Sequence, residues 1–182
     1  MGSNRPCFSF SAQCREGFNS DTNDLQRTAS RVWGAGISGF NTSFRLADFP
    51  EGLSNLVALD EIRSGISPID PRGTWALGMV GASITAGFTG GPNNAVIGDG
   101  INSCGILKLT LGDRALNQMR MPCQTAAMQA NFSAGARSLH VGIVNVLKLD
   151  GSVEAVSDQI DLQTWVGIHS KDSNLVERLF AL

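Results

Sequence analysis

Residues 139–156 read LHVGIVNVLKLDGSVEAV, and this stretch is the most informative part of the chain. Two strand-like runs flank Asp150-Gly151, and this dipeptide between such runs is the strongest short-range hairpin signal, because a type I′ turn needs positive φ at both central residues. A two-residue loop would place Lys148 opposite Val153. One face of the hairpin would then be apolar and buried, since it would carry Val144, Val146, Val153 and Ala155.

The hairpin also carries a family resemblance. His140, nine intervening residues and then Asp150-Gly151 resemble the C-terminal signature of domain of unknown function 1559, a large family of pilin-like proteins abundant in planctomycete bacteria. Further segments resemble the family in the expected order, namely residues 45–55, 61–63, 72–78 and 161–165. Because these segments are spread over most of the chain, the resemblance is more specific than any one of its motifs.

Two features depart from the family pattern. Members typically read His-Pro-Gly-Gly, whereas this chain reads His140-Val141-Gly142-Ile143, so extended strand is expected where the family has a turn. Full-length members begin with a prepilin-type leader and a long apolar helix, and residues 1–17 resemble neither. We therefore expect the soluble C-terminal part of such a protein, or a variant without its anchor, and no transmembrane segment in this chain.

The resemblance implies both an architecture and a role. The expected fold is α+β and mainly β, an antiparallel sheet with a C-terminal hairpin and helix, similar to the globular head of a pseudopilin. Residues 1–30 are expected to form an irregular lead-in, and residues 31–182 a single domain. The implied function is that of a non-enzymatic structural or surface subunit of a type II secretion or pilus-like envelope assembly, with other such subunits as partners. A prepilin leader on the natural protein would make it exported, periplasmic or on the cell surface.

Four cysteines bear on the same question: Cys7, Cys14, Cys104 and Cys123. Three full pairings are possible and the sequence alone does not choose among them. Cys104 and Cys123 resemble paired positions in the family and bracket residues 106–119, so the resemblance implies a disulfide there. Such a disulfide would persist in an exported protein. The cysteines do not suggest a zinc site, because none of them lies in a Cys-x-x-Cys motif.

Composition excludes some classes of function. The chain has 14 basic and 16 acidic residues, and they are scattered along the sequence. A nucleic-acid-binding protein needs a basic face to neutralise phosphates, so we expect no nucleic-acid partner.

The remaining elements are predicted from local pattern. Strands are expected within 32–44, 56–62 and 73–79, and helices at 106–119 and 125–132. A final helix is expected with Asp158 as its cap and with Ile160, Trp165 and Ile168 toward the core. The three tryptophans, Trp33, Trp75 and Trp165, are expected in the core. Residues 87–105 hold six glycines and one proline and are expected to be a long loop.

No motif demands catalysis. If residues 140–150 were one extended strand, His140 and Asp150 would lie roughly 33 Å apart and could not share a proton. The glycines around Ser38 have the wrong spacing for G-x-S-x-G, and no phosphate-loop or H-E-x-x-H motif occurs. A hydrolase around His140 is therefore the weakest alternative, and we expect no enzyme.

Two binding alternatives stay open. The loop at 87–105 would suit a ligand such as a glycan if an exposed Trp or Phe lay beside it. Calcium is the one cofactor that the sequence suggests, because hard oxygen ligands occur at Asn93, Asn94, Asp99, Asn102 and Asp113. The EF-hand spacing is absent, so these residues are also compatible with ordinary turns.

Overall fold

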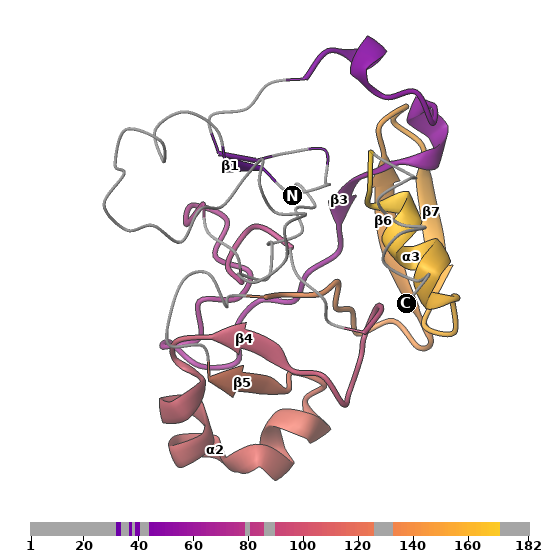
Figure 1. The fold of residues 1–182 in the computed structure, drawn as a ribbon. Coiled ribbons are helices and arrows are strands. Elements are labelled where there is room, and N and C mark those ends of the chain that lie inside the picture. The colour runs from indigo at the N-terminus through magenta and orange to yellow at the C-terminus, as the bar shows by residue number, and fades with distance from the viewer. Residues whose placement is uncertain are drawn as a thin grey trace, which may run out of the picture.

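The computed structural model describes residues 32–33, 37, 39–40, 44–78, 81–85, 90–125 and 133–171. The fold is α+β, as predicted, and its largest sheet is antiparallel. Figure 1 shows two groups of elements, one around this sheet and one around α2, joined by irregular segments. Among the described residues, no helix has the length and apolar character needed to cross a membrane.

The main sheet has three strands in the order β3-β6-β7. These are β3 (Val57–Asp60), β6 (Ile143–Lys148) and β7 (Val153–Ser157), all antiparallel to their neighbours. Helix α3 (Leu162–Ile168) lies along one face of β6 and β7 (Figure 1). Between helix and sheet lies one apolar cluster, made of Val57, Ala136, Val144, Val146, Val156 and Trp165. Burial of these side chains drives the two layers together.

The predicted hairpin forms, but its register differs by one residue. Lys148 N–H donates to the Ser152 carbonyl, so the loop has three residues, and Leu147 faces Val153. Only Gly151 in this loop has positive φ, at 88°, which fits a type I turn followed by a bulge residue rather than a type I′ turn. A one-residue shift turns each side chain on the second strand to the other face. Val144 and Val146 are buried as predicted, whereas the burial predicted for Val153 is wrong because 70% of it is exposed.

A smaller sheet pairs β4 (Asp99–Ile101) with β5 (Cys123–Thr125) in parallel. The crossover between them is α2 (Cys104–Gln118), which matches the predicted helix. The Cys104–Cys123 disulfide is confirmed, with 5.7 Å between the Cα atoms. Ile101, Leu107 and Leu116 pack against it to form a second apolar cluster. The expected loop at 87–105 therefore contains a strand and the first residues of a helix.

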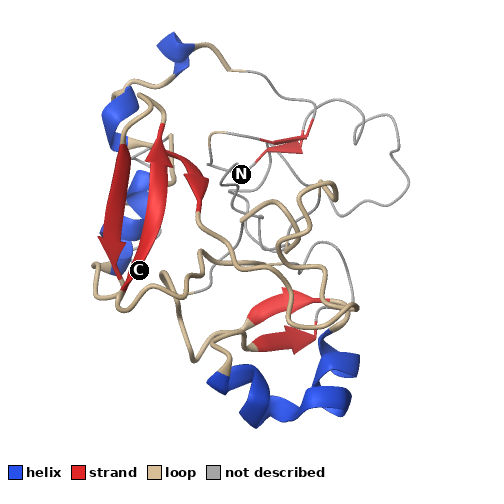
Figure 2. Cartoon of the chain, turned by 180° about the vertical axis from the view of Figure 1, so that it is seen from behind, coloured by secondary structure: helices blue, strands red, loops and turns tan. Residues whose placement is uncertain are grey.

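Two further strands and two short helices complete the described elements. Strand β1 (Val32–Trp33) pairs antiparallel with β2 (Gly39–Phe40), and the 3-10 helices span Leu46–Asp48 and Leu53–Asn55. Figure 2 shows the strands and helices from the opposite side.

Three local predictions are wrong. Residues 73–78 form turns instead of a strand, because Thr74 N–H donates to Pro71 and Leu77 N–H donates to Thr74. Trp75 lies in this segment and is 77% exposed instead of buried. The cap of α3 is Asp161, whose carboxylate accepts from Thr164 N–H at 2.9 Å, and not Asp158.

The other local predictions include one that is wrong, one that is confirmed and several that lie outside the described residues. Residues 139–142 form a bend with φ of 75° at Gly142, so the extended strand expected after His140 is wrong. Trp165 is in the core, as predicted. The remaining expectations lie outside the described residues: the lead-in at 1–30, Cys7 and Cys14, the side chain of Trp33, and the helix expected at 125–132, beyond Thr125, which ends β5.

Candidate functional site

Glu61 forms a polar junction at the end of β3. One carboxylate oxygen accepts from the Ser138 hydroxyl at 2.9 Å. The other accepts from the backbone and side-chain nitrogens of Asn145, at 2.9 and 3.1 Å. The Glu61 backbone also pairs with Asn145 and with Arg137. One acidic residue thus ties β3 to β6 and to the segment that leads into β6.

His140 lies at the outer side of this junction. Its Nε2 atom is 3.5 Å from Oε1 of Glu61, and 55% of its side chain is exposed. Its backbone N–H donates to the Ser138 hydroxyl at 2.9 Å, and its carbonyl accepts from Arg120 at 3.3 Å. The serine, glutamate and histidine are therefore close together, but the hydroxyl donates to the carboxylate and not to the imidazole. Ser138 is fully buried.

Asn93 connects the 90–97 segment to the main sheet. Its side-chain nitrogen donates to the Ile143 carbonyl at 3.1 Å and to Asp158 at 2.8 Å, while its oxygen accepts from Ser138 N–H at 2.7 Å. The Asn94 side chain bonds within its own loop, to Gly90 and to two backbone N–H groups. Both amides are used internally, which leaves neither free to recognise a ligand.

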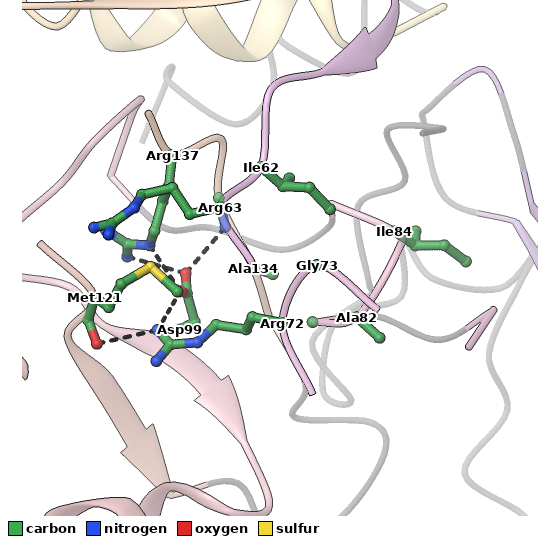
Figure 3. Close-up of a pocket in the computed structure, with 12 residues that line it drawn as sticks. Ile62, Arg63, Arg72, Gly73, Ala82, Ile84, Asp99, Met121, Ala134 and Arg137 are labelled. Atoms are coloured by element: carbon green, nitrogen blue, oxygen red, sulfur yellow. Dashed lines mark hydrogen bonds and ion pairs between the residues drawn. The ribbon is translucent and has the colours of Figure 1, made fainter. Parts of the chain in front are cut away.

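Asp99 is the centre of a buried charge network (Figure 3). Arg72 Nη1 lies 2.9 Å from its carboxylate, and Arg137 donates to both oxygens at 2.7 and 3.0 Å. Arg72 also pairs with Asp70 and donates to two backbone carbonyls. Burial lowers the pKa of Arg72, but hydrogen bonds and charge from Asp70 and Asp99 outweigh it and raise the pKa overall.

The structure does not assemble the candidate calcium ligands. Asp99 is paired with two arginines, whereas Asn102 is exposed and Asp113 pairs with Lys108 at 2.9 Å on the outside of α2. No group of three or more His, Cys, Asp or Glu side chains suited to a metal occurs in the part of the chain that is described. The cavity beside Asp99 measures about 10 Å³, which is room for one water molecule.

A second buried pair was missed by sequence reasoning. His169 Nε2 lies 2.8 Å from Asp60, and its Nδ1 lies 2.8 Å from the Trp165 carbonyl. The ring packs on Trp165 at 4.2 Å between centroids. Because a carbonyl only accepts, Nδ1 must donate, and the arrangement suits an imidazolium beside a carboxylate. Both ring nitrogens are then occupied, so this histidine has no free lone pair for base catalysis.

The pair shifts both ionisations. Burial raises the pKa of Asp60, but the His169 charge and the hydrogen bonds from His169 and Thr85 bring it below its ordinary value. Burial likewise lowers the pKa of His169, and Asp60 and the Trp165 carbonyl more than reverse this, so that pKa is raised. The only sequence signal was the spacing of His169 one helical turn after Trp165; its contact with Asp60 spans 109 residues.

Comparison with known proteins identifies the chain. The family model described as "Protein of unknown function (DUF1559)" matches residues 10–163. The chain belongs to the DUF1559 family. The predicted resemblance is thereby confirmed. Searches of curated proteins and of solved structures found no significant match.

His140 and Asp150-Gly151, whose spacing carries the resemblance to the family, lie at opposite ends of β6. His140 precedes the strand and contacts Glu61, whereas Asp150-Gly151 forms the turn that follows it. Asp150 accepts from the Ser152 hydroxyl and N–H, at 2.7 and 2.9 Å, and these bonds hold the pKa of Asp150 below its ordinary value. His140 and Asp150-Gly151 therefore flank the central strand.

Proposed function

We propose that this chain is a non-catalytic structural or surface subunit of a type II secretion or pilus-like envelope assembly. The proposal rests on one contrast: both described histidines contact carboxylates of the protein itself, whereas several large apolar side chains of the protein are exposed. The signature histidine contacts Glu61, and the other described histidine is paired with Asp60. Large apolar side chains, by contrast, face solvent.

Trp75 is the strongest candidate for a contact residue. It is 77% exposed, and Ile69 and Leu77 in the same turn-rich segment are also exposed. Exposed apolar side chains that gather in one region suggest a surface that a partner covers, and tryptophan is among the residues enriched at binding hot spots. We assign the segment 69–77 to contact with another envelope subunit.

Export of the protein is part of the same proposal. The Cys104–Cys123 disulfide suits an oxidising compartment, because cytosolic thiols are kept reduced. The pilin-like character of the family also favours the periplasm or the cell surface.

Photo-cross-linking in the native bacterium tests the proposal. A photoreactive amino acid at position 75 should yield adducts with envelope proteins, whereas the same group at Leu109, which is 88% exposed on α2, should yield few. Equal adduct patterns from the two positions would contradict the role of Trp75. A hydrolytic activity of the purified chain that disappears in His140→Ala would replace the whole proposal with an enzyme.

Hydrolysis has little support from the geometry around His140. A serine nucleophile must reach a substrate and pass its proton to a base. Ser138 is fully buried, so a substrate cannot reach it, and its hydroxyl donates to Glu61 instead of His140.

A glycan-binding module is the second candidate, and the exposed ring of Trp75 favours it. Aromatic faces offer a broad apolar platform with a polar edge. The aromatic residue would come from the 69–77 segment and not from the described part of the 87–105 loop, which contains none. Titration of Trp fluorescence with soluble envelope glycans, in the wild type and in Trp75→Ala, distinguishes this function from subunit contact.

A further inference from the structure

Strand β7 is an open edge of the main sheet. It is the outer strand in the order β3-β6-β7, and Figure 2 shows it on the side away from β3. The Ser152 carbonyl accepts from Lys148 N–H, and Asp158 N–H donates to the Gly142 carbonyl. Along an antiparallel strand, residues bonded to the neighbouring strand alternate with residues whose backbone groups face the other way. The N–H and C=O groups of Val153, Ala155 and Ser157 therefore face away from β6. Of these outward-facing backbone groups, only the Ser157 carbonyl has a hydrogen-bond partner among the described residues: it accepts from the Ile160 N–H.

The edge lacks the features that usually prevent strand pairing. Such features include proline, lysine and bulges. The sequence of β7 is VEAVS, and its register with β6 runs without a shift from Val153 to Ser157. Its one charged residue, Glu154, forms an ion pair with Lys148 of the same sheet. The backbone is thus open to another strand, and little charge opposes its approach.

Both faces beside this edge are partly apolar. On the α3 side, a groove of about 520 Å³ runs between helix and strand and includes Val156, Ile160 and Ile168 in its lining. On the opposite face, the register aligns Leu59, Leu147 and Val153 in one row across the three strands. Leu59 and Val153 are exposed, so the row ends in solvent at the β7 edge.

We infer that β7 pairs antiparallel with β7 of a second copy of this chain, about a two-fold axis at Ala155. The two three-stranded sheets would then form one sheet of six strands. This inference deepens the proposed function, on which it rests, by naming a partner and the surface that binds it.

Self-complementarity selects the second copy as the occupant. With the axis at Ala155, Val153 faces Ser157 of the partner subunit, and Glu154 faces Val156 of the partner subunit. No two carboxylates are directly opposite, and like charges in such positions would destabilise the pair. The register uses the whole strand, and an isologous two-fold contact is the commonest form of self-association.

Sedimentation velocity of the purified full chain over a range of concentrations tests the pairing. The wild type should form a dimer. Val153→Lys places a charge at the edge and should weaken the dimer by at least about tenfold. Leu109→Lys is the matched control, because it adds the same charge at an exposed apolar position on α2, and it should leave the dimer unchanged.

Ala155→Pro provides a second variant. The N–H of Ala155 faces away from β6, so proline removes a donor to the partner and no bond of the β6–β7 ladder. It should weaken the dimer as strongly as Val153→Lys, and urea unfolding verifies that each variant is folded. Amide exchange at Val153 and Ala155 should also slow with rising concentration in the wild type alone.

A wild type that stays monomeric, or a dimer that both edge variants leave intact, overturns the inference. Self-association of the purified chain tests the edge pairing, and cross-linking in cells tests the proposed function, so either proposal can be contradicted without the other. Monomeric protein with Trp75-dependent adducts would remove the edge pairing and keep the proposed function, whereas a catalytic activity lost in His140→Ala would remove the proposed function and keep the dimer.

Discussion

Gly151 determines the hairpin register through one backbone dihedral angle. Its φ of 88° lies in the left-handed region, where a side chain is strained, and the Gly151 N–H closes the turn on Lys148. Gly151→Val should lower the free energy of unfolding by about 1–3 kcal/mol in urea titrations. Gly78→Val is the matched control, since both glycines are exposed and have open space at Cβ, but Gly78 has no such φ. Equal losses in the two variants would contradict this account.

The buried His169–Asp60 pair should make stability depend on pH. The raised pKa of His169 stabilises the fold fully below its unfolded value of about 6.5, and this contribution is lost as pH rises through the folded pKa. The lowered pKa of Asp60 stabilises the fold above about pH 3.9, and this contribution is lost as pH falls through the folded pKa. His169→Gln should therefore cost most between about pH 4 and pH 6.5, and its cost should shrink at alkaline pH. Urea unfolding of both proteins from pH 4 to pH 9 measures this, and a cost independent of pH would exclude the ion pair as its source.

Sequence reasoning was reliable for single residues where the local chain determines the outcome. The turn at Asp150-Gly151 and the positive φ of Gly151 follow from turn chemistry. The loop length does not, because a two-residue loop and a three-residue loop with a bulge fit the same dipeptide. That one residue of difference exposed Val153.

Contacts between elements made by charged residues far apart in the sequence are the part of the fold that could not be predicted. Asp99 begins β4, and its partners Arg72 and Arg137 lie 27 and 38 residues away. The carboxylate of Asp99 suits a calcium ligand when the sequence alone is considered, whereas its contacts with Arg72 and Arg137 make it part of a buried ion network. The prediction of a strand at 73–79 is wrong for a related reason. Hydrogen bonds of turns around Pro71 and Thr74 override the apolar pattern of that segment.

Asp99→Asn tests the connection between these elements. Removal of the charge leaves two buried arginines without their shared partner and should cost about 3–5 kcal/mol in the free energy of unfolding. Asp113→Asn is the control, because its pair with Lys108 is exposed and should cost less than about 1 kcal/mol. Similar values for both variants, measured by urea titration, would mean that the Asp99 network does not hold the elements together.

At the scale of the described molecule, an internally bonded polar framework occurs together with several exposed large apolar side chains. Glu61 joins β3, β6 and residues 137–138, and Asn93 joins the 90–97 segment to the same place. The family, the fold class and the Cys104–Cys123 disulfide could all be predicted from sequence motifs. The Glu61 junction could not, because its contacts with Ser138 and Asn145 span 77 and 84 residues.

We expect the polar junction around Glu61 to stabilise the molecule, with His140 only at its outer side. Urea unfolding of Glu61→Ala and His140→Ala, measured side by side, tests it most directly. Glu61→Ala leaves the Ser138 hydroxyl and the Asn145 nitrogens without their acceptor and should cost about 2–4 kcal/mol, whereas exposed His140 should cost less than about 1 kcal/mol. A Glu61→Ala variant as stable as the wild type would contradict the claim, because the junction would then have to be maintained for some purpose other than stability.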